Sequence, residues 1–286
     1  MKGSYLPLAP ILALAVACSQ SDKKGSDTTA AVPETAAPAV INLTASDYAF
    51  DGPDSATAGP TWIRMTNTGK EFHHVILVHM EAGHTVDELL KSMGSSEKPP
   101  EWAQLIGGPI APSPGATMAT QTAVPLKPGA YALICVIPAA DGMPHVAKGM
   151  VRQLTVTPPA VATASAPIVS TTTMTLADYS FALTTPLAAG KNTIRVVNGG
   201  GQPHEVVIIK MFAGKKVEDV IAFSAKPTGP PPGEVVGGAS FIAGDVSNFV
   251  EVDLAAGDYA LVCFAPDAKD GKPHVAHGMF QAFKIG

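Results

Sequence analysis

The chain has 286 residues, of which 46% are hydrophobic, and a formal net charge of -5. This length suits two domains of about 100–150 residues each, and the apolar content is sufficient for packed cores. The 19 Lys and Arg residues form no basic stripe, which argues against nucleic-acid binding as a function. The 27 Gly and 26 Pro residues, together with the absence of long heptad patterns, favour short strands joined by turns.

The N-terminal region predicts export. Residues 6–17 are apolar apart from two prolines, a run too short to span a bilayer but of the size of the apolar part of a signal peptide. The Ala-Val-Ala sequence at residues 15–17, followed by Cys18, resembles the lipobox of bacterial lipoproteins, with Ala15 in place of the usual Leu. We therefore expect a signal peptide over residues 1–17 and a lipidated Cys18. Ordinary signal cleavage, which would give a secreted soluble protein, and an uncleaved segment are the alternatives.

Residues 18–39 predict a disordered tether. They are rich in Ser, Thr, Asp, Ala and Pro, and such a composition cannot bury enough apolar surface to fold. No second apolar run reaches membrane-spanning length. The predicted location is therefore the periplasmic or extracellular side of the cell envelope, with the lipid anchor as the contact to the membrane.

The second half of the chain repeats the first. The repeat is far longer than that of a solenoid, so each copy is interpreted as a domain. We place domain 1 at residues 40–158, a linker at 159–167 and domain 2 at 168–286, and we expect each domain to fold alone. The matching segments are 47–50 and 178–181, 63–67 and 194–198, 73–76 and 204–207, 131–135 and 259–263, and 141–150 and 270–279.

In chain order, the first copy predicts strands at 61–66, 75–78, 118–126, 131–137 and 151–157, which are short, β-branched and bounded by Gly or Pro. A helix is expected between the second and third strands, where residues 85–88 form a capping box. Several strands with one short helix in each copy predict an all-β fold of two sandwiches in tandem. The apolar residues on one face of the helix are Val86, Leu89, Leu90 and Met93, with a weaker equivalent in Val217, Val220 and Ile221.

Four residue types that bind soft metals recur at matched places in both copies. A thiolate with two imidazoles and a weak thioether is the ligand set of a blue-copper centre. The sulfur ligands favour Cu(I), while the imidazoles suit both oxidation states. The pattern predicts one mononuclear copper site in each domain and two copper ions per chain. The predicted ligands are His73, Cys135, His145 and Met150 in the first copy and His204, Cys263, His274 and Met279 in the second.

The context of these residues resembles the cupredoxin family of plastocyanins, azurins and related domains. Both copies have a Gly-x-Tyr-x-x-x-Cys segment, at 129–135 and 257–263, followed by Pro, His and Gly-Met. In both, a strand ending in Asn and a Gly-containing turn precede the first His. The resemblance implies a Greek-key β-sandwich in which the Cys, the second His and the Met surround the loop between the last two strands. It also implies that the second His presents an edge near the surface for electron entry.

The sequence departs from the family pattern at several places. The loop from the Cys to the second His is longer than in plastocyanin-like proteins, and we expect a turn in it at Asp-Gly 141–142 and 270–271. His74 or Glu205 follows the first His, where Asn is common, and Val136 or Phe264 follows the Cys, where a polar residue is common. These differences affect the expected geometry and potential of each site.

Other interpretations of the same residues stay open. Cys135 and Cys263 could be inert buried thiols or could form a disulfide with each other. The predicted His ligands could be loop or core histidines, and the Met ligands could fill gaps in the core. Histidines without a matching His in the other copy are expected at the surface, with the alternative that His74 or His277 tunes or extends a site. Asp47, Tyr48, Arg64 and their counterparts are expected to be structural. The unmatched histidines are His74, His79, His84 and His277.

The function expected from these features is extracytoplasmic electron transfer, without enzymatic activity, between the copper sites and an unidentified redox protein. Copper storage, delivery or resistance would use the same ligands with a copper donor or acceptor as partner. A copper enzyme would need further ligands, such as a His directly before the Cys, where Ile134 and Val262 stand, or His-x-His pairs, which the sequence lacks. A metal-free binding module that keeps only the fold is the remaining alternative.

Overall fold

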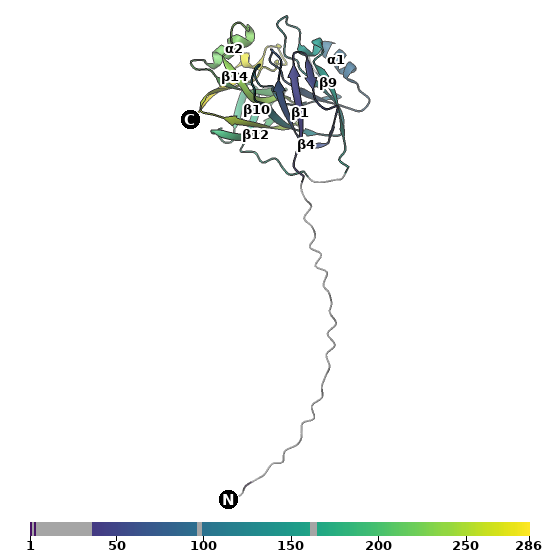
Figure 1. The fold of residues 1–286 in the computed structure, drawn as a ribbon, viewed down its shortest axis with the longest axis vertical. Helices are drawn as coiled ribbons and strands as arrows, with labels where there is room; N and C mark the ends of the chain where they lie inside the picture. The colour runs from purple at the N-terminus through teal and green to yellow at the C-terminus, as the bar shows by residue number, and fades with distance from the viewer. Residues whose placement is uncertain (2, 4–35, 96–98, 161–164) are drawn as a thin grey trace. The chain divides into compact units, whose positions relative to one another are not determined.

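Strands dominate the computed structural model, which describes residues 1, 3, 36–95, 99–160 and 165–286. The predicted signal peptide, apart from Met1 and Gly3, and the predicted lipidation site Cys18 lie outside the described residues, as do most of the tether and part of the linker. No helix in the described part of the chain is long and apolar enough to cross a membrane. Residues from 35 onward form one unit, in which the two copies follow each other along the chain (Figure 1).

The first copy contributes strands to two sheets, and α1 (Val86–Ser95) lies between β5 and β6 in the chain. In the first sheet β1 pairs in parallel with β4, which pairs antiparallel with β7. The strands of this sheet, in spatial order, are β2 (Ala49–Asp51), β1 (Ala39–Ser46), β4 (Gly59–Asn67) and β7 (Thr120–Leu126). Those of the second are β6 (Ala103–Gly107), β5 (Ile76–Met80), β8 (Gly129–Ile134), β9 (Val151–Thr157) and β3 (Ser55–Thr57).

The second copy has the same strand order except that β3 has no counterpart in it, and α2 (Val217–Ala225) takes the place of α1. Two sheets with one short helix per copy agree with the all-β, tandem architecture expected from the sequence. Its first sheet contains β11 (Ser180–Leu183), β10 (Thr172–Ala177), β12 (Gly190–Asn198) and β15 (Ser247–Leu254). Its second contains β14 (Gly233–Ile242), β13 (His204–Met211), β16 (Gly257–Val262) and β17 (Phe280–Ile285).

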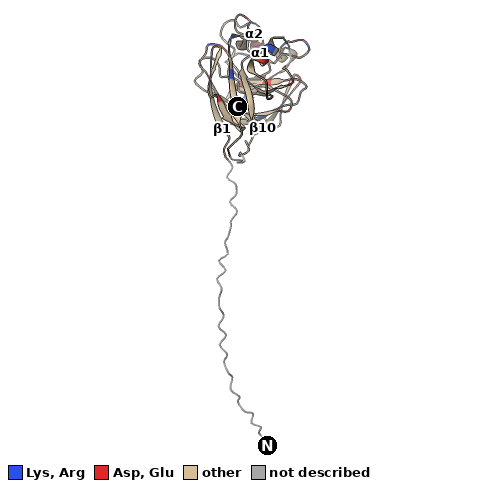
Figure 2. Ribbon diagram, turned by 90° about the vertical axis from the view of Figure 1, so that its right-hand side faces the viewer, with Lys and Arg blue, Asp and Glu red and all other residues tan. Residues whose placement is uncertain are grey.

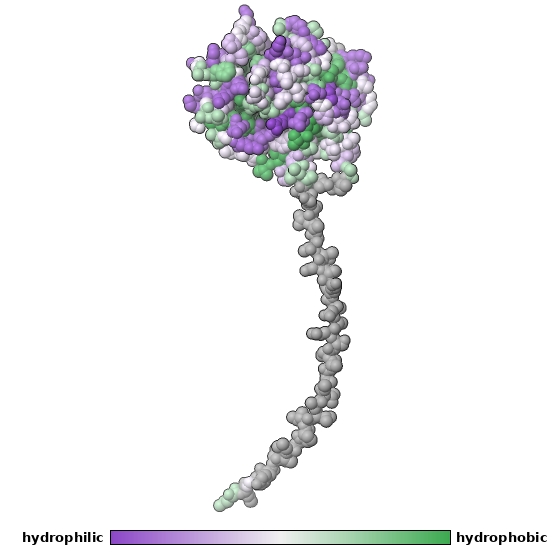
Figure 3. Space-filling model, viewed as in Figure 1, coloured by the Kyte–Doolittle hydropathy of each residue, from purple (hydrophilic) through white to green (hydrophobic). Residues whose placement is uncertain are grey.

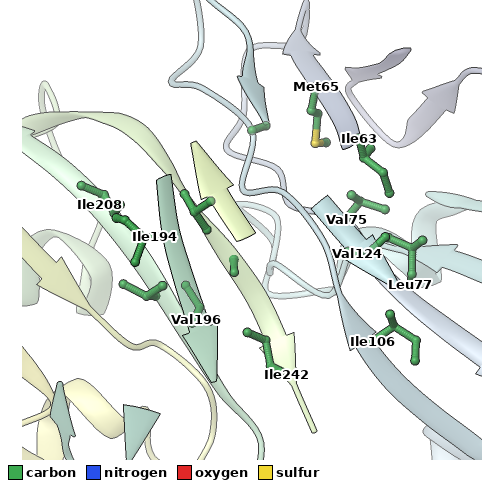
Figure 4. Close-up of a cluster of buried hydrophobic side chains, with 14 of the residues drawn as sticks. Ile63, Met65, Val75, Leu77, Ile106, Val124, Ile194, Val196, Ile208 and Ile242 are labelled. Atoms are coloured by element: carbon green, nitrogen blue, oxygen red, sulfur yellow. The ribbon is translucent and has the colours of Figure 1, made fainter. Parts of the chain in front are cut away.

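The two copies share both sheets. Strand β7 pairs antiparallel with β15, and β6 pairs antiparallel with β14, so the sheets have eight and nine strands. One hydrophobic cluster contains side chains from both copies, among them Ile63 and Met65 from the first and Ile194 and Ile242 from the second (Figure 4). The copies are therefore joined by strand pairing and by apolar packing, beyond the linker alone.

Side-chain alternation explains the core. Along β4, Ile63 and Met65 are buried while Arg64 between them is exposed, as expected for a strand with one face against the core. Strands β5 and β13 are apolar on both faces because a helix covers the outer one. Leu89 of α1 packs with β5 residues, and Val217 of α2 packs with β13 residues.

The capping box predicted for the first helix is present. Thr85 Oγ1 accepts a hydrogen bond from the Glu88 N–H at 3.2 Å, and Glu88 Oε2 accepts one from the Thr85 N–H at 2.9 Å. The second helix keeps half of this arrangement, since the Asp219 carboxylate accepts a bond from the Lys216 N–H at 2.8 Å. The helix whose sequence contains the capping-box pattern, at 85–88, thus has both capping hydrogen bonds, whereas the second helix has one.

Charged side chains are scattered over the surface. In Figure 2 the Lys and Arg residues form no stripe, and most of each visible strand carries no charge. The face in Figure 3 mixes hydrophilic and hydrophobic residues. Single exposed apolar side chains such as Val40, Met143 and Phe212 are ordinary for a folded surface and carry no function by themselves.

Candidate metal centres

In the first copy the structure brings His73, Cys135 and His145 together. His73 lies before β5, Cys135 directly follows β8, and His145 begins a short 3-10 helix (His145–Lys148). His73 Nδ1 lies 3.1 Å from His145 Nδ1, and Cys135 Sγ lies 3.5 Å from that same nitrogen. The three donor atoms all lie within 4.8 Å of one another, and all three residues are buried. This group is called the first centre below.

The second copy repeats the arrangement with His204, Cys263 and His274. His204 begins β13, Cys263 follows β16, and His274 begins the matching 3-10 helix (His274–His277). The two Nδ1 atoms are 3.0 Å apart, and Cys263 Sγ lies 3.4 Å from His274 Nδ1. This group is called the second centre below. The same three residue types in the same geometry, found twice, are hard to attribute to chance core packing.

The two predicted Met ligands lie next to these groups and are fully buried. Met150 accepts a hydrogen bond from the Cys135 N–H through its carbonyl and donates its N–H to the His145 carbonyl. Met279 makes the same two backbone contacts with Cys263 and His274. Each 3-10 helix ends in a Gly in the left-handed region, with φ of 103° and 94°, which turns the chain so that the Met follows at once. Backbone bonds thus fix each Met beside its centre.

The loop to the first His is held by the Asn at the end of the preceding strand. Asn67 is buried and its amide donates to the Glu71 carbonyl at 3.0 Å, while Asn198 donates to the Gln202 carbonyl at 2.8 Å. A Cβ at Gly69 would lie 2.8 Å from His73 Nε2, too close for any other residue without a shift. The Asn and Gly of the sequence motif therefore position the first His.

Carboxylates set the tautomer of three of the four imidazoles. Asp47 Oδ1 lies 3.3 Å from His73 Nε2, and Asp178 Oδ1 lies 2.9 Å from His204 Nε2. Glu71 Oε2 lies 2.8 Å from His145 Nε2. Because an ionised carboxylate can only accept, Nε2 carries the proton and the Nδ1 lone pair faces the centre. Two lone pairs at this separation repel, so a cation between them stabilises the arrangement.

Burial keeps the donors neutral when no metal is bound. It raises the pKa of the Cys135 thiol to about 11 and that of Cys263 to about 12, against the opposing effect of nearby backbone N–H groups. Burial also lowers the pKa of His73, His204 and His274. A metal ion must therefore displace the thiol proton, while burial favours the neutral, metal-binding form of these three imidazoles.

The donor set fits copper. Two imidazole nitrogens and a cysteine sulfur, with a buried Met beside them, are the ligands that suit a mononuclear copper site of the blue-copper type. One such set occurs in each copy, which corresponds to two copper ions per chain. The alternative of a disulfide is wrong, because Cys135 and Cys263 are both free and buried.

The sequence analysis assigned only structural roles to the repeated Asp-Tyr pair, which contacts the centres. Asp47 and Asp178 hold the first His of each copy, as described above. Tyr48 donates its hydroxyl hydrogen to Glu71 Oε1 at 2.8 Å, and Tyr179 donates to Asp267 at 2.5 Å. Both tyrosines have positive φ, 66° and 64°, which is uncommon for a bulky residue. The recurrence of Asp-Tyr-x-Phe in both copies was the available signal.

The second His, expected to present an edge near the surface, is covered by a tyrosine ring in each copy. The side chains of His145 and His274 have no exposed area. Tyr48 lies edge-on to His145 with ring centroids 5.2 Å apart, and Tyr179 covers His274 in the same way at 5.6 Å. The turn that holds each tyrosine at positive φ places its ring over the site.

The surface assignment of His74 is also wrong, because this side chain is buried against Glu205, which is buried as well. Burial lowers the pKa of His74 to about 3 and raises that of Glu205 to about 7. Of the other unmatched histidines, His277 is exposed, and His79 and His84 are partly exposed. The error arose because His74 was compared only with histidines, whereas its equivalent in the second copy is a carboxylate.

No family model matches the chain, and no curated protein does. Among solved structures, an auracyanin of Roseiflexus castenholzii is 20% identical and is matched over 43% of this chain and 99% of its own, with a TM-score of 0.28. Auracyanin A, a blue copper protein of Chloroflexus aurantiacus, is 20% identical and is matched over 42% of this chain and 99% of its own, with a TM-score of 0.29. A blue copper oxidase of Nitrosomonas europaea is 13% identical and is matched over 87% of this chain and 86% of its own, with a TM-score of 0.25. Because these scores are low, we base the assignment of the centres on their donor geometry.

Proposed function

We propose that this protein is an extracytoplasmic electron carrier with one copper ion in each copy. The observation that supports this most directly is the duplicated set of two facing Nδ1 atoms and one cysteine Sγ within 4.8 Å. Copper bound there supplies one-electron chemistry between Cu(I) and Cu(II). A donor set held by a rigid framework lowers the rearrangement that accompanies a change of oxidation state.

Different residues of the chain would serve as the thiolate ligand, orient the imidazoles and cover the centres. The buried thiol of Cys135 or Cys263 becomes the thiolate ligand, and the backbone N–H of Glu205 donates to Cys263 Sγ at 3.4 Å. Asp47 and Asp178 hold the first imidazole of each centre in its binding tautomer. The tyrosine rings cover the second His of each centre, whose side chain has no exposed area, and we propose no enzymatic role.

The location and partner belong to the same proposal. Export with a lipid at Cys18 would hold the copper centres near a membrane surface, where a redox protein would be the electron donor or acceptor. Fractionation of cells that express the wild-type chain and Cys18→Ala tests this. Membrane association of the wild type that is lost in the variant supports the anchor, whereas soluble wild-type protein starting with an unmodified Cys18 contradicts it.

Copper storage or delivery is the second candidate, and the burial of both second histidines favours it. With His145 and His274 covered by tyrosine rings, no imidazole edge reaches the surface for rapid electron exchange. Stopped-flow mixing of the oxidised copper protein with a reduced c-type cytochrome separates the two functions. Bleaching of the visible absorption within seconds supports electron transfer. Absorption that persists, together with transfer of copper to a chelating acceptor, supports storage.

A further inference from the structure

A pair of buried side chains outside the donor sets connects the two centres. His74 and Glu205 occupy equivalent positions in the two copies, each directly after the first His of its centre. Their side chains are only 5% and 4% exposed, and His74 Nδ1 lies 3.8 Å from Glu205 Oε2. The contact therefore crosses from one copy to the other between the two metal sites. Phe241 of β14 packs edge-on against His74, with ring centroids 5.6 Å apart, and helps to enclose it.

Each member of the pair also contacts the peptide that follows the Cys of its own copy. The Val136 N–H donates to His74 Nε2 at 3.2 Å, and the Phe264 N–H donates to Glu205 Oε1 at 3.0 Å. These two N–H groups belong to the peptide bonds formed with Cys135 and Cys263. A chain of close contacts therefore runs from one cysteine, through His74 and Glu205, to the other cysteine.

The hydrogen bonds fix where the proton of His74 lies. Because Nε2 accepts from Val136, a neutral His74 carries its proton on Nδ1, the atom that faces Glu205. Glu205 Oε2 is one of four buried side-chain atoms in the described chain that have no hydrogen-bond partner, and His74 Nδ1 lies 3.8 Å from it, beyond hydrogen-bond distance. A protonated Nδ1 cannot bind a metal ion, so the pair is a close polar contact and not a third metal site.

We propose that His74 and Glu205 form the path by which an electron passes between the two centres, an inference that rests on the electron-transfer function proposed above. Tunnelling is faster through covalent and hydrogen bonds than across gaps. This path has a hydrogen bond at each end, and its one step through space is the 3.8 Å between His74 Nδ1 and Glu205 Oε2. In each exchange the reduced centre loses one electron as Cu(I) becomes Cu(II), and the other centre gains it as Cu(II) becomes Cu(I). No covalent bond breaks and no proton leaves the pair.

The test uses the full, copper-loaded chain. Pulse radiolysis reduces it with less than one electron per chain, and internal exchange is then seen as an absorption change whose rate does not depend on protein concentration. The main variant is His74→Leu combined with Glu205→Leu, because an apolar pair of similar volume often replaces a buried polar pair without loss of stability. We expect the internal rate to fall about tenfold or more, equivalent to about 1.4 kcal/mol. Both copper ions and both visible bands should remain.

Two further variants separate the path from general packing. His74→Glu combined with Glu205→His reverses the pair, and because each position faces the same kind of N–H, it should restore most of the wild-type rate. Asp245→Asn is the matched control. Asp245 accepts a hydrogen bond from Gln104 of the other copy at 2.8 Å, an exposed contact between the copies that involves neither His74 nor Glu205. This variant should keep the wild-type rate.

Three results would overturn the inference. The first is an internal rate that the double Leu variant leaves unchanged, or that the reversed pair fails to restore. The second is a wild-type protein with two copper ions and two visible bands but no concentration-independent phase. The third is a third copper ion that is lost in the double Leu variant. A chain that binds no copper overturns the proposed function itself, and the inference with it.

Discussion

At the scale of single residues, each centre depends on groups that never touch the metal. The imidazole of His204 is held by Asp178 at 2.9 Å, and that of His73 by Asp47 at 3.3 Å. Partners of this kind orient a ligand and fix its tautomer, and their loss costs about 10–100-fold in metal affinity. The two aspartates are therefore as much a part of the sites as the donors are.

Asp178→Ala should weaken Cu(I) binding at the second centre by about 10–100-fold and leave the first centre unchanged. Asp178→Asn is the matched control, because its side-chain oxygen still accepts from His204 Nε2 and should preserve most of the affinity. Competition with a colorimetric Cu(I) chelator measures both. Equal affinities for wild type and the Ala variant would show that Asp178 has no part in binding.

Single residues also show which parts of the centres could be predicted from the sequence and which could not. The donors were predictable because the same four residue types recur in both copies. The tyrosine covers were not, since positive φ at Tyr48 and Tyr179 has no local sequence signal. The equivalent positions of His74 and Glu205 were noted in the sequence, but the contact between their side chains was not predicted, since it depends on how the two copies pack together. Only their shared position after the first His indicates that they belong together.

At the scale of elements, local patterns predicted type better than length. The expected strand at 151–157 has the same bounds as β9, whereas the one at 131–137 extends past β8, which ends at Ile134. The chain leaves the sheet there because the Cys and the following residues turn toward the centre. Strands β1, β2, β3 and β6 were not predicted. For β2 and β3 the reason is that three residues are too few to show alternation.

The capping box of α1 offers a test at this scale. Thr85→Ala removes the hydroxyl that accepts from the Glu88 N–H, and should lower the free energy of unfolding by about 1 kcal/mol. Thr85→Ser keeps the hydroxyl and should lose much less. Urea unfolding of the metal-free protein measures both. An equal loss in the two variants would mean that the methyl group and not the cap is responsible.

At the scale of the whole molecule, the pairing of β7 with β15 and of β6 with β14 could not be read from the sequence. In the sequence these four strands have no pattern that distinguishes them from ordinary edge strands, and no local pattern indicates that the strands of one copy pair with those of the other. The sequence analysis expected two domains that fold alone, but the shared sheets and the shared hydrophobic cluster favour mutual dependence. A half on its own would expose two strand edges and part of that cluster.

We therefore expect the metal-free chain to unfold in one cooperative transition. Calorimetry of residues 36–286 should give equal calorimetric and van't Hoff enthalpies. The separate halves, 40–158 and 168–286, should unfold at lower temperature or not cooperatively, and mixing them should restore part of the stability. Two separate transitions in the full chain, or halves as stable as the whole, would support independent domains instead.

The central claim is that each copy builds its own copper centre, and metal stoichiometry combined with cysteine substitution tests it most directly. The purified copper-loaded chain should contain two copper ions and show thiolate-to-Cu(II) absorption in the visible. Cys135→Ser should remove the first centre and retain the second, and Cys263→Ser should do the reverse, because oxygen is a poor substitute for the soft thiolate. A single copper ion per chain that either substitution abolishes would show one shared site, and would contradict this account.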